Sequence, residues 1–283
     1  HVEWPKAPKG DAKPKSNDTL FLYLPHDTAT KLWPALTANE DQLPALGTEL
    51  DGSFAHTRKL VGDKGTVMVE NVCGFWQGSD PVLRNEVIIV SAHYDHEGVK
   101  SDGQVMNGAD DNGSGTSTLL ALAEALVTNG AMRRSVMLMW VSGEEKGLWG
   151  SQAWTEHPWL PGDCRPVCDI NIDMVGRNAS DYLLITPTAA RPEYNGLVKL
   201  AEEYAPLEGF PKLGSCDSYW NRSDHANFAA NLKIPVTFIF SDVHADYHKP
   251  GDDPEKIDFD KIRRVTRLVL RMIAGLQDDK LAL

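Results

Sequence analysis

The sequence from Val87 to Leu126 reads Val-Ile-Ile-Val-Ser-Ala-His93-Tyr-Asp95-His96, then a loop, then Gly-Ala-Asp-Asp-Asn-Gly-Ser-Gly115 and a leucine-rich run. The unbroken β-branched residues predict a strand that is buried on both faces. The leucine-rich run predicts a helix that packs on the resulting sheet. Binding residues of open α/β sheets collect where strands end and helices begin. The His and Asp residues here are therefore candidates for metal binding or acid–base chemistry.

Strand and helix patterns alternate along the rest of the chain. This alternation predicts one α/β domain with a mostly parallel core and antiparallel edges. Two runs with glycines between them predict a hairpin at a sheet edge, at 53–61 and 65–75. Further strands are expected at 86–92, 135–141, 167–172, 182–186 and 234–240. Helices are expected after Gly115 and at 192–204 and 258–276, the last with Arg264, Arg267 and Arg271 on a solvated face.

Composition excludes several classes of protein. The chain has 283 residues, of which 42% are hydrophobic and 24% charged, as in ordinary globular domains. Its formal net charge of −12 argues against nucleic-acid binding. No apolar run reaches the roughly 20 residues that cross a bilayer, so no membrane span is expected. The chain starts at His1 instead of Met. We therefore expect a processed N-terminus and a secreted or periplasmic location, with a signal peptide removed.

Two regions allow more than one interpretation. Residues 1–18 are rich in Pro and Lys and read as a solvated lead-in, followed by a short strand at 20–24 and a helix at 29–36. The cysteines are Cys73, Cys164, Cys168 and Cys216. They are too isolated for a structural zinc site. Buried, idle thiols and a short Cys164–Cys168 disulfide loop remain equal alternatives.

Five polar clusters follow apolar strands or lie in loops: His93/Asp95, Asp110/Asp111, Glu144/Glu145, Asp173, and His248 within 246–253. Each cluster alone is more typical of a structural or solvated residue. Together they place several acids at the ends of buried strands, where ionised acids are rarely left without a counter-charge. One or two metal ions would supply that charge.

The ordered motifs resemble those of the M28 metallopeptidases, the co-catalytic dizinc aminopeptidases. They are His-x-Asp, Gly-Ala-x-Asp-Asn-x-Ser-Gly, Ser-Gly-Glu-Glu-x-Gly-Leu-x-Gly-Ser, Asn-x-Asp-Met and Tyr-His-x-Pro-x-Asp. The resemblance covers about residues 65–275. It implies a three-layer sandwich, in which helices flank a central mixed, mostly parallel sheet. It also implies a catalytic domain at 51–283, with residues 1–50 as a lead-in or the tail of a protease-associated domain.

The resemblance also implies a role for each matching residue. Two Zn²⁺ per chain, with Co²⁺ or Mn²⁺ as substitutes, would be held by His93, Asp111, Glu145, Asp173 and His248. Asp111 would bridge the ions, with a cis peptide bond after it, and Asp110 would be a flanking residue. Asp95 would orient His93 through its carboxylate. Glu144 would be the general base that deprotonates a metal-bound water.

Further residues are expected around the substrate. Tyr247 would hydrogen-bond the developing oxyanion, and Met174 would line the wall of the site. An apolar pocket for Leu-like side chains would contain Tyr219, Trp220 and Phe228, and Phe240 fits either that pocket or the core. The segment Ser223-Asp224-His225 cannot form a serine triad, because three consecutive side chains cannot face one another in relay. It is expected to be structural or to line the pocket.

The expected function is that of a zinc aminopeptidase, a hydrolase that removes N-terminal residues from peptide substrates. Three alternatives share the fold. A glutamate-type carboxypeptidase would need a basic cluster, for which Arg177, Arg191 and Arg222 are available. A glutaminyl cyclase would be a mononuclear relative. A catalytically inactive receptor-like module would usually have lost ligands. The sequence does not define the oligomeric state.

Overall fold

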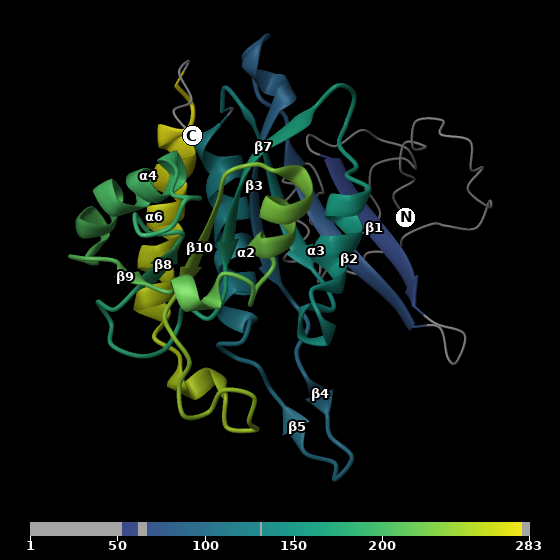
Figure 1. Cartoon of the computed structure of the whole chain (residues 1–283), viewed down its shortest axis with the longest axis vertical. Coiled ribbons are helices and arrows are strands. Elements are labelled where there is room, and N and C mark those ends of the chain that lie inside the picture. The colour runs from purple at the N-terminus through teal and green to yellow at the C-terminus, as the bar shows by residue number, and fades with distance from the viewer. Residues whose placement is uncertain (1–52, 62–66, 131, 279–283) are drawn as a thin grey trace, which may run out of the picture. The chain divides into compact units, whose positions relative to one another are not determined.

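The structure is a computed structural model that describes residues 53–61, 67–130 and 132–278. The chain divides into two units, His1–Ser53 and Phe54–Leu283, and the fold below is that of the second (Figure 1). The predictions for residues 1–50 lie outside the described residues. The main sheet has the strand order β1-β2-β6-β3-β7-β10-β8-β9.

The centre of the sheet is parallel. Strand β3 (Glu86–His93) lies between β6 (Ser135–Val141) and β7 (Arg165–Ile172), and β10 (Val236–Phe240) pairs with the far side of β7. All of these pairings are parallel, so the strands end at the same edge of the sheet. This edge is where an open α/β sheet places its ligands.

The flanking strands complete the mixed sheet. Antiparallel pairing joins β2 (Val67–Trp76) to β6, and β8 (Leu184–Thr186) to β10. The short β9 (Gly214–Ser215) is parallel to β8. Strand β1 (Ser53–Val61) lies beside β2 at the edge of the sheet, where the hairpin was predicted. The parallel core and antiparallel edges predicted from the sequence are confirmed.

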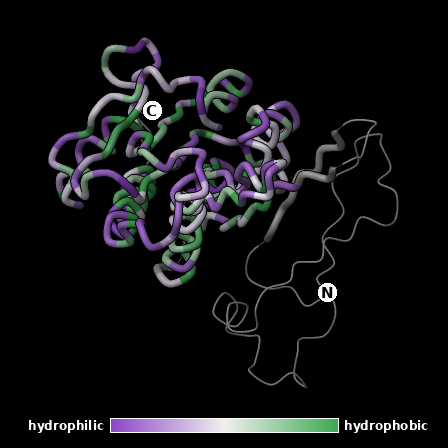
Figure 2. The backbone as a smooth tube through the Cα atoms, turned by 90° about the horizontal axis from the view of Figure 1, so that it is seen from below, coloured by the Kyte–Doolittle hydropathy of each residue, from purple (hydrophilic) through white to green (hydrophobic). Residues whose placement is uncertain are grey.

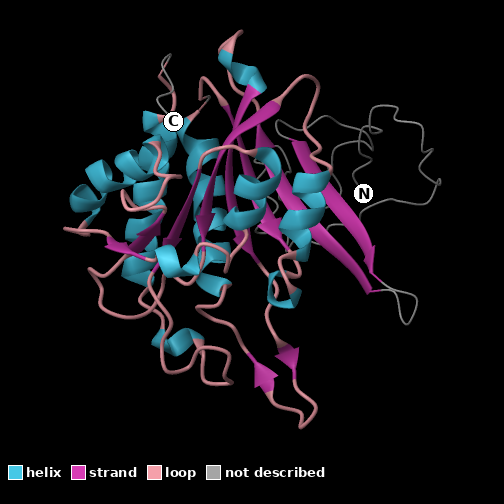
Figure 3. Ribbon diagram, viewed as in Figure 1, coloured by secondary structure: helices cyan, strands magenta, loops and turns pink. Residues whose placement is uncertain are grey.

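Helices cover both faces of the sheet (Figure 3). One face carries α2 (Gly113–Asn129), α4 (Gly196–Tyr204) and α6 (Phe259–Gly275), whose apolar residues share one core cluster. The other face carries α3 (Trp149–Glu156) and the short α5 (His225–Asn227), which contact β2, β7 and β10. The predicted three-layer sandwich is therefore correct. Single helical turns lie at Leu83–Asn85, Glu144–Lys146, Ala205–Glu208, Asp217–Tyr219, Phe228–Leu232 and Pro254–Lys256.

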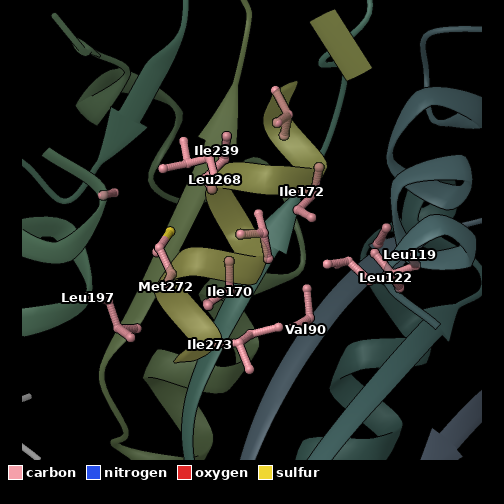
Figure 4. Close-up of a cluster of buried hydrophobic side chains, with 14 of the residues drawn as sticks. Val90, Leu119, Leu122, Ile170, Ile172, Leu197, Ile239, Leu268, Met272 and Ile273 are labelled. Atoms are coloured by element: carbon pink, nitrogen blue, oxygen red, sulfur yellow. The ribbon is translucent and has the colours of Figure 1, made fainter. Parts of the chain in front are cut away.

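The residues of β3 show why both faces need cover. Ile88 and Val90 point into the cluster under α2 and α6, whereas Val87 and Ile89 point into the cluster on the other face, and all four are fully buried. Figure 4 shows Val90 and its neighbours packed against α2 and α6. In Figure 2 most loops at the outer edge of the described body are hydrophilic.

The core predicts a measurable difference between two adjacent leucines of α2. Leu119 is 0% exposed and lies in the core, whereas Leu120 is 54% exposed. We expect Leu119→Ala to lower the free energy of unfolding by about 2–5 kcal/mol, because it removes buried methyl groups and leaves a cavity. Leu120→Ala should change it by less than about 0.5 kcal/mol. Urea unfolding of both variants tests the packing of α2, and equal losses would contradict it.

Several details of the sequence prediction were wrong. The last strand begins at Val236, not at 234. Helix α4 begins at Gly196, not at 192, because Asn195 caps it by accepting the N–H groups of Leu197 and Val198. The arginines of α6 are not simply solvated: Arg267 and Arg271 pair with the buried carboxylate of Glu208, and Arg264 lies over the ring of Phe210.

One short ribbon lies outside the layers. A ribbon of β4 (Gly98–Val99) and β5 (Val105–Met106) extends from the carboxyl edge of the main sheet (Figure 1). All four cysteines are free, so the idle-thiol alternative describes them. Within the described residues, none of the helices has the length and apolar character that a membrane span requires.

Candidate metal centre

The site lies at the edge where the parallel strands end. His93 is the last residue of β3, Glu144 and Glu145 follow β6, Asp173 follows β7, and His248 lies in the loop after β10. The turn before α2 adds Asp111. The structure thus brings together all the residues that the M28 motifs predicted as metal ligands or general base.

One group of donors surrounds His93, which is 1% exposed. Its Nε2 atom lies 3.4 Å from Asp111 Oδ1 and 3.4 Å from Asp173 Oδ1. Ligand atoms of His93, Glu144 and Asp173 lie within 4.8 Å of one another. Ser223 donates a hydrogen bond of 2.8 Å to the other oxygen of Asp173, which leaves Oδ1 facing the imidazole.

A second group shares Asp111 with the first. His248 Nε2 lies 3.2 Å from Asp111 Oδ2 and 3.1 Å from Glu145 Oε2. On the other side of Glu145, His96 Nδ1 lies 2.7 Å from Oε1. Glu97 also approaches, with Oε1 3.6 Å from His248 Nδ1. Asp111 therefore faces one group with each of its carboxylate oxygens, as a bridging ligand would.

Asp95 differs from its expected role. The main-chain carbonyl of Asp95 accepts the hydrogen bond from His93 Nδ1, at 3.0 Å, while its carboxylate oxygen lies 3.8 Å away. The carboxylate instead accepts the main-chain N–H groups of Glu144, at 3.2 Å, and Glu145, at 3.4 Å. Asp95 thus orients His93 with its backbone and the two glutamates with its side chain.

The glycine-rich turn is fixed to the end of β7. Asn112 caps α2 by accepting the Gly115 N–H at 2.8 Å, and it donates to the carbonyl of Ile172 at 2.9 Å. A Cβ at Gly115 would lie 2.3 Å from Asn112 Oδ1, so the close approach requires glycine. The peptide bond between Asp111 and Asn112 is cis, as the resemblance implied.

The donors fit metal ions. Among the described residues, His93 Nε2, Asp173 Oδ1 and His96 Nε2 are buried without a hydrogen-bond partner. Buried polar atoms normally have partners, and buried charges are normally paired or bind metals. Imidazole and carboxylate donors without thiolate suit zinc with open positions, and cobalt or manganese less well. The residues therefore fit two ions that share Asp111.

The protein's own charges shift the pKa values of the site. Burial raises the pKa of Glu144 to about 9; His93 opposes the shift, and Asp173, Asp224 and Glu145 add to it. Hydrogen bonds to Asp111 and Glu145 raise the pKa of His248 to about 10. For His93, burial acts against protonation, but the neighbouring acids prevail and raise its pKa well above the ordinary value. These shifts record a concentration of negative charge, which a cation would neutralise.

The expected substrate pocket is divided between two clusters. Met174 and Tyr219 pack with Tyr247 in one apolar cluster, and the Tyr247 ring stacks on His248 at 3.9 Å between centroids. Phe228 is 0% exposed and packs on Trp154 in the core, so its assignment to the pocket is wrong. Trp220 packs on the core cluster that contains Phe228 and Trp154, and not on the cluster that contains Met174. Phe240, at 3% exposure, is buried in the same cluster as Met174, and its ring contacts that of Tyr219.

Ser223, Asp224 and His225 do not form a relay. Ser223 binds Asp173, whereas the ring of His225 stacks on Phe238 at 4.7 Å between centroids. Asp224 is 0% exposed, and burial raises its pKa to about 7, which His93 opposes. The segment thus holds Asp173 through Ser223 and packs on the sheet through His225, in line with the structural role expected for it.

Sequence reasoning missed His96 and Glu97 as neighbours of the second group. The signal was present, because His96 follows Asp95 directly in the His-x-Asp-His sequence after β3. Nothing in that spacing showed that the chain turns so that His96 faces Glu145. The contact of 2.7 Å between them therefore emerges only from the fold.

An α/β sandwich that gathers imidazoles and carboxylates at its carboxyl edge is typical of a class of metal-binding proteins. Peptidase family M28 matches residues 71–273, which is most of the chain. The chain therefore belongs to the M28 peptidase family, as its motifs predicted.

Individual relatives agree with this family. Aminopeptidase YwaD of Bacillus subtilis is 23% identical over 263 residues, covering 88% of this chain and 55% of that protein. A zinc aminopeptidase structure from Bacillus subtilis has a TM-score of 0.60 at 24% identity, covering 75% of this chain and 50% of that chain. A glutaminyl cyclase from Porphyromonas gingivalis has a TM-score of 0.64 at 20% identity, covering 79% and 83%. The chain spans about half the length of the curated relatives it matches.

Proposed function

We propose that the chain is the catalytic part of a zinc-dependent aminopeptidase, which removes N-terminal residues from peptides and binds two zinc ions. The observation that carries the proposal is the position of Glu144 beside the two groups of ligands that share Asp111. His93, Asp111 and Asp173 would hold one ion, and Asp111, Glu145 and His248 the other. Family membership and the names of the relatives support this assignment.

The residues of the chain would divide the chemistry. When bound, zinc supplies a Lewis acid that polarises a carbonyl group and lowers the pKa of water. Glu144 accepts a proton from the attacking water and returns it to the leaving amine. Tyr247, whose ring stacks on that of His248, would donate a hydrogen bond from its hydroxyl to the developing oxyanion.

The charges around the second group favour a substrate with a free amine. Glu97, whose Oε1 lies 3.6 Å from His248 Nδ1, is assigned to neither ion, so its charge would attract an ammonium group. The arginines that a carboxypeptidase would need are largely engaged elsewhere. Arg177 pairs with Asp246 at 2.8 Å, and Arg191 pairs with Glu193 at 3.1 Å and lies over the Trp220 ring. The site therefore fits the N-terminus of a peptide better than its C-terminus.

The free amine predicts a test with two substrates. We expect leucine p-nitroanilide to be hydrolysed roughly 10- to 100-fold faster, as kcat/KM, than N-acetyl-leucine p-nitroanilide, because the acetyl group removes a charged contact. The apolar cluster of Met174, Tyr219 and Tyr247 makes leucine the first side chain to try. Equal rates for both substrates would contradict an aminopeptidase. Cyclisation of N-terminal glutamine without hydrolysis of the leucine substrate would instead favour a glutaminyl cyclase.

Secretion or export to the periplasm stays a prediction, as does the assignment of residues 1–50 to a lead-in or a protease-associated domain.

A further inference from the structure

The motif Tyr-His-x-Pro-x-Asp ends at Asp252, a carboxylate that belongs to neither group of metal ligands. Asp252 is 0% exposed and follows His248 by four residues. A buried carboxylate requires hydrogen bonds or charges that offset the loss of hydration. The contacts of Asp252 therefore indicate what it does.

Asp252 binds the turn that carries Asp111. Its main-chain carbonyl accepts the N–H of Ala109 at 3.1 Å. Its Oδ2 atom accepts the N–H of Asp110 at 3.0 Å and the N–H of Asp111 at 3.1 Å. Three successive N–H groups of the turn thus donate hydrogen bonds to Asp252, which lies in the loop that carries His248.

The other oxygen of Asp252 faces cationic groups. Its Oδ1 atom lies 3.7 Å from Arg177 Nη1 and 3.9 Å from His244 Nε2. All three atoms are buried, and none has a hydrogen-bond partner among the residues that the structure describes. The carboxylate is therefore held between main-chain N–H groups on one side and Arg177 and His244 on the other.

Asp110 extends the same connection to the third ligand segment. Its Oδ1 atom accepts the N–H of Gly176 at 2.6 Å, and its Oδ2 atom lies 3.3 Å from His244 Nε2. Gly176 follows Asp173 by three residues. The segments that carry Asp111, Asp173 and His248 thus meet at one buried polar cluster, made of Asp110, Arg177, His244 and Asp252.

We propose that Asp252 is a positioning residue of the metal centre, which holds the bridging Asp111 and the ligand His248 at the separation that a shared cation requires. This inference rests on the proposed function. Asp111 Oδ2 and His248 Nε2 lie 3.2 Å apart, although they come from segments far apart in the sequence. Asp252 joins these segments directly. Outer partners of metal ligands typically contribute about 10- to 100-fold to metal affinity.

The test compares zinc release from two neighbouring variants. Asp252→Asn removes the charge that faces Arg177 and weakens the acceptor for the N–H groups of the turn. Asp253→Asn removes the same charge one residue later, where the carboxylate accepts a hydrogen bond of 2.7 Å from the Asn107 side-chain amide. Both proteins and the wild type are first loaded with zinc, and their zinc content is measured. Release is then followed by absorbance after the addition of an excess of a chromogenic chelator.

We expect Asp252→Asn to release zinc roughly 10- to 100-fold faster than the wild type, and Asp253→Asn to match the wild type. A purely structural role would lower the unfolding temperature of Asp252→Asn and leave its release rate unchanged, which would overturn the inference. Equal acceleration in both variants would overturn it as well, since that would be a general effect of charge. A wild type that binds no zinc would instead refute the proposed function, and is recognised before any variant is compared.

A variant that folds only with zinc is still measured, because the loaded protein is the starting state. If Asp252→Asn does not fold even with zinc, His244→Gln takes its place. It removes the imidazole that faces Asp252 Oδ1 and Asp110 Oδ2 and retains the hydrogen bonds to the turn. We expect a smaller acceleration of zinc release from it, and no acceleration would overturn the inference.

Discussion

Replacing Glu144 by Gln should reduce turnover roughly 10²- to 10⁴-fold while both zinc ions remain bound. Glutamine has nearly the shape of glutamate but cannot accept a proton. Glu144 lies beside His93 and Asp173. The contacts of His248 with Asp111 and Glu145 do not involve Glu144. The loss should therefore appear in kcat and hardly in zinc content. Leucine p-nitroanilide hydrolysis and metal analysis of the same sample measure both.

Glu156→Gln is the matched control for this variant. Glu156 is an exposed residue at the end of α3, where it accepts a hydrogen bond of 2.8 Å from the Gln152 side chain. The substitution removes the same charge far from the chemistry and should leave kcat unchanged. Loss of zinc from Glu144→Gln would show that Glu144 is a ligand. The roles of Glu144 and Glu145 would then have to be reassigned.

Removing zinc by exhaustive chelation should abolish hydrolysis of leucine p-nitroanilide, and adding zinc back should restore it. Without cations, the acids around Asp111 and Glu145 have only imidazoles to offset their charge. Zinc should also stabilise the fold, because it binds the folded chain preferentially. At free zinc about 1,000 times Kd, this stabilisation reaches about 4 kcal/mol.

Thermal unfolding with and without zinc measures this effect independently of activity. Treatment with the chelator already saturated with zinc is the control, since it leaves the metal in place. Hydrolysis that survives complete removal of the metal would contradict the proposed function. An unchanged unfolding temperature would show that the donor groups do not bind zinc.

The fold was largely predictable because its central strands are short apolar runs with clear ends. The strand at 135–141 has the predicted bounds, and β3 differs only by reaching His93. The errors arose where local side chains decide an end. Pro192 suggested an early start for α4, but the cap formed by Asn195 determines where the helix begins. Nor did the periodicity of α6 reveal that Arg267 and Arg271 pair with a distant buried acid.

The site was predictable where it depends on residue type and order, and not where it depends on the path of the backbone. The motifs named the residues that the fold brings together at the edge of the sheet. They did not show that the carbonyl of Asp95, instead of its carboxylate, meets His93. They also did not reveal the contact between His96 and Glu145 or the main-chain bonds of Asp252. Phe228 was misplaced because an aromatic residue near a motif fits a pocket and a core equally well.

The central claim is that one Asp111 serves two zinc ions in a hydrolytic site. The most direct test is to add zinc in known equivalents to metal-free protein while following the hydrolysis of leucine p-nitroanilide. The account predicts no hydrolysis without zinc and a rate that rises until two equivalents are bound per chain, then stays constant. Full activity with one equivalent, or activity that does not depend on zinc, would contradict it.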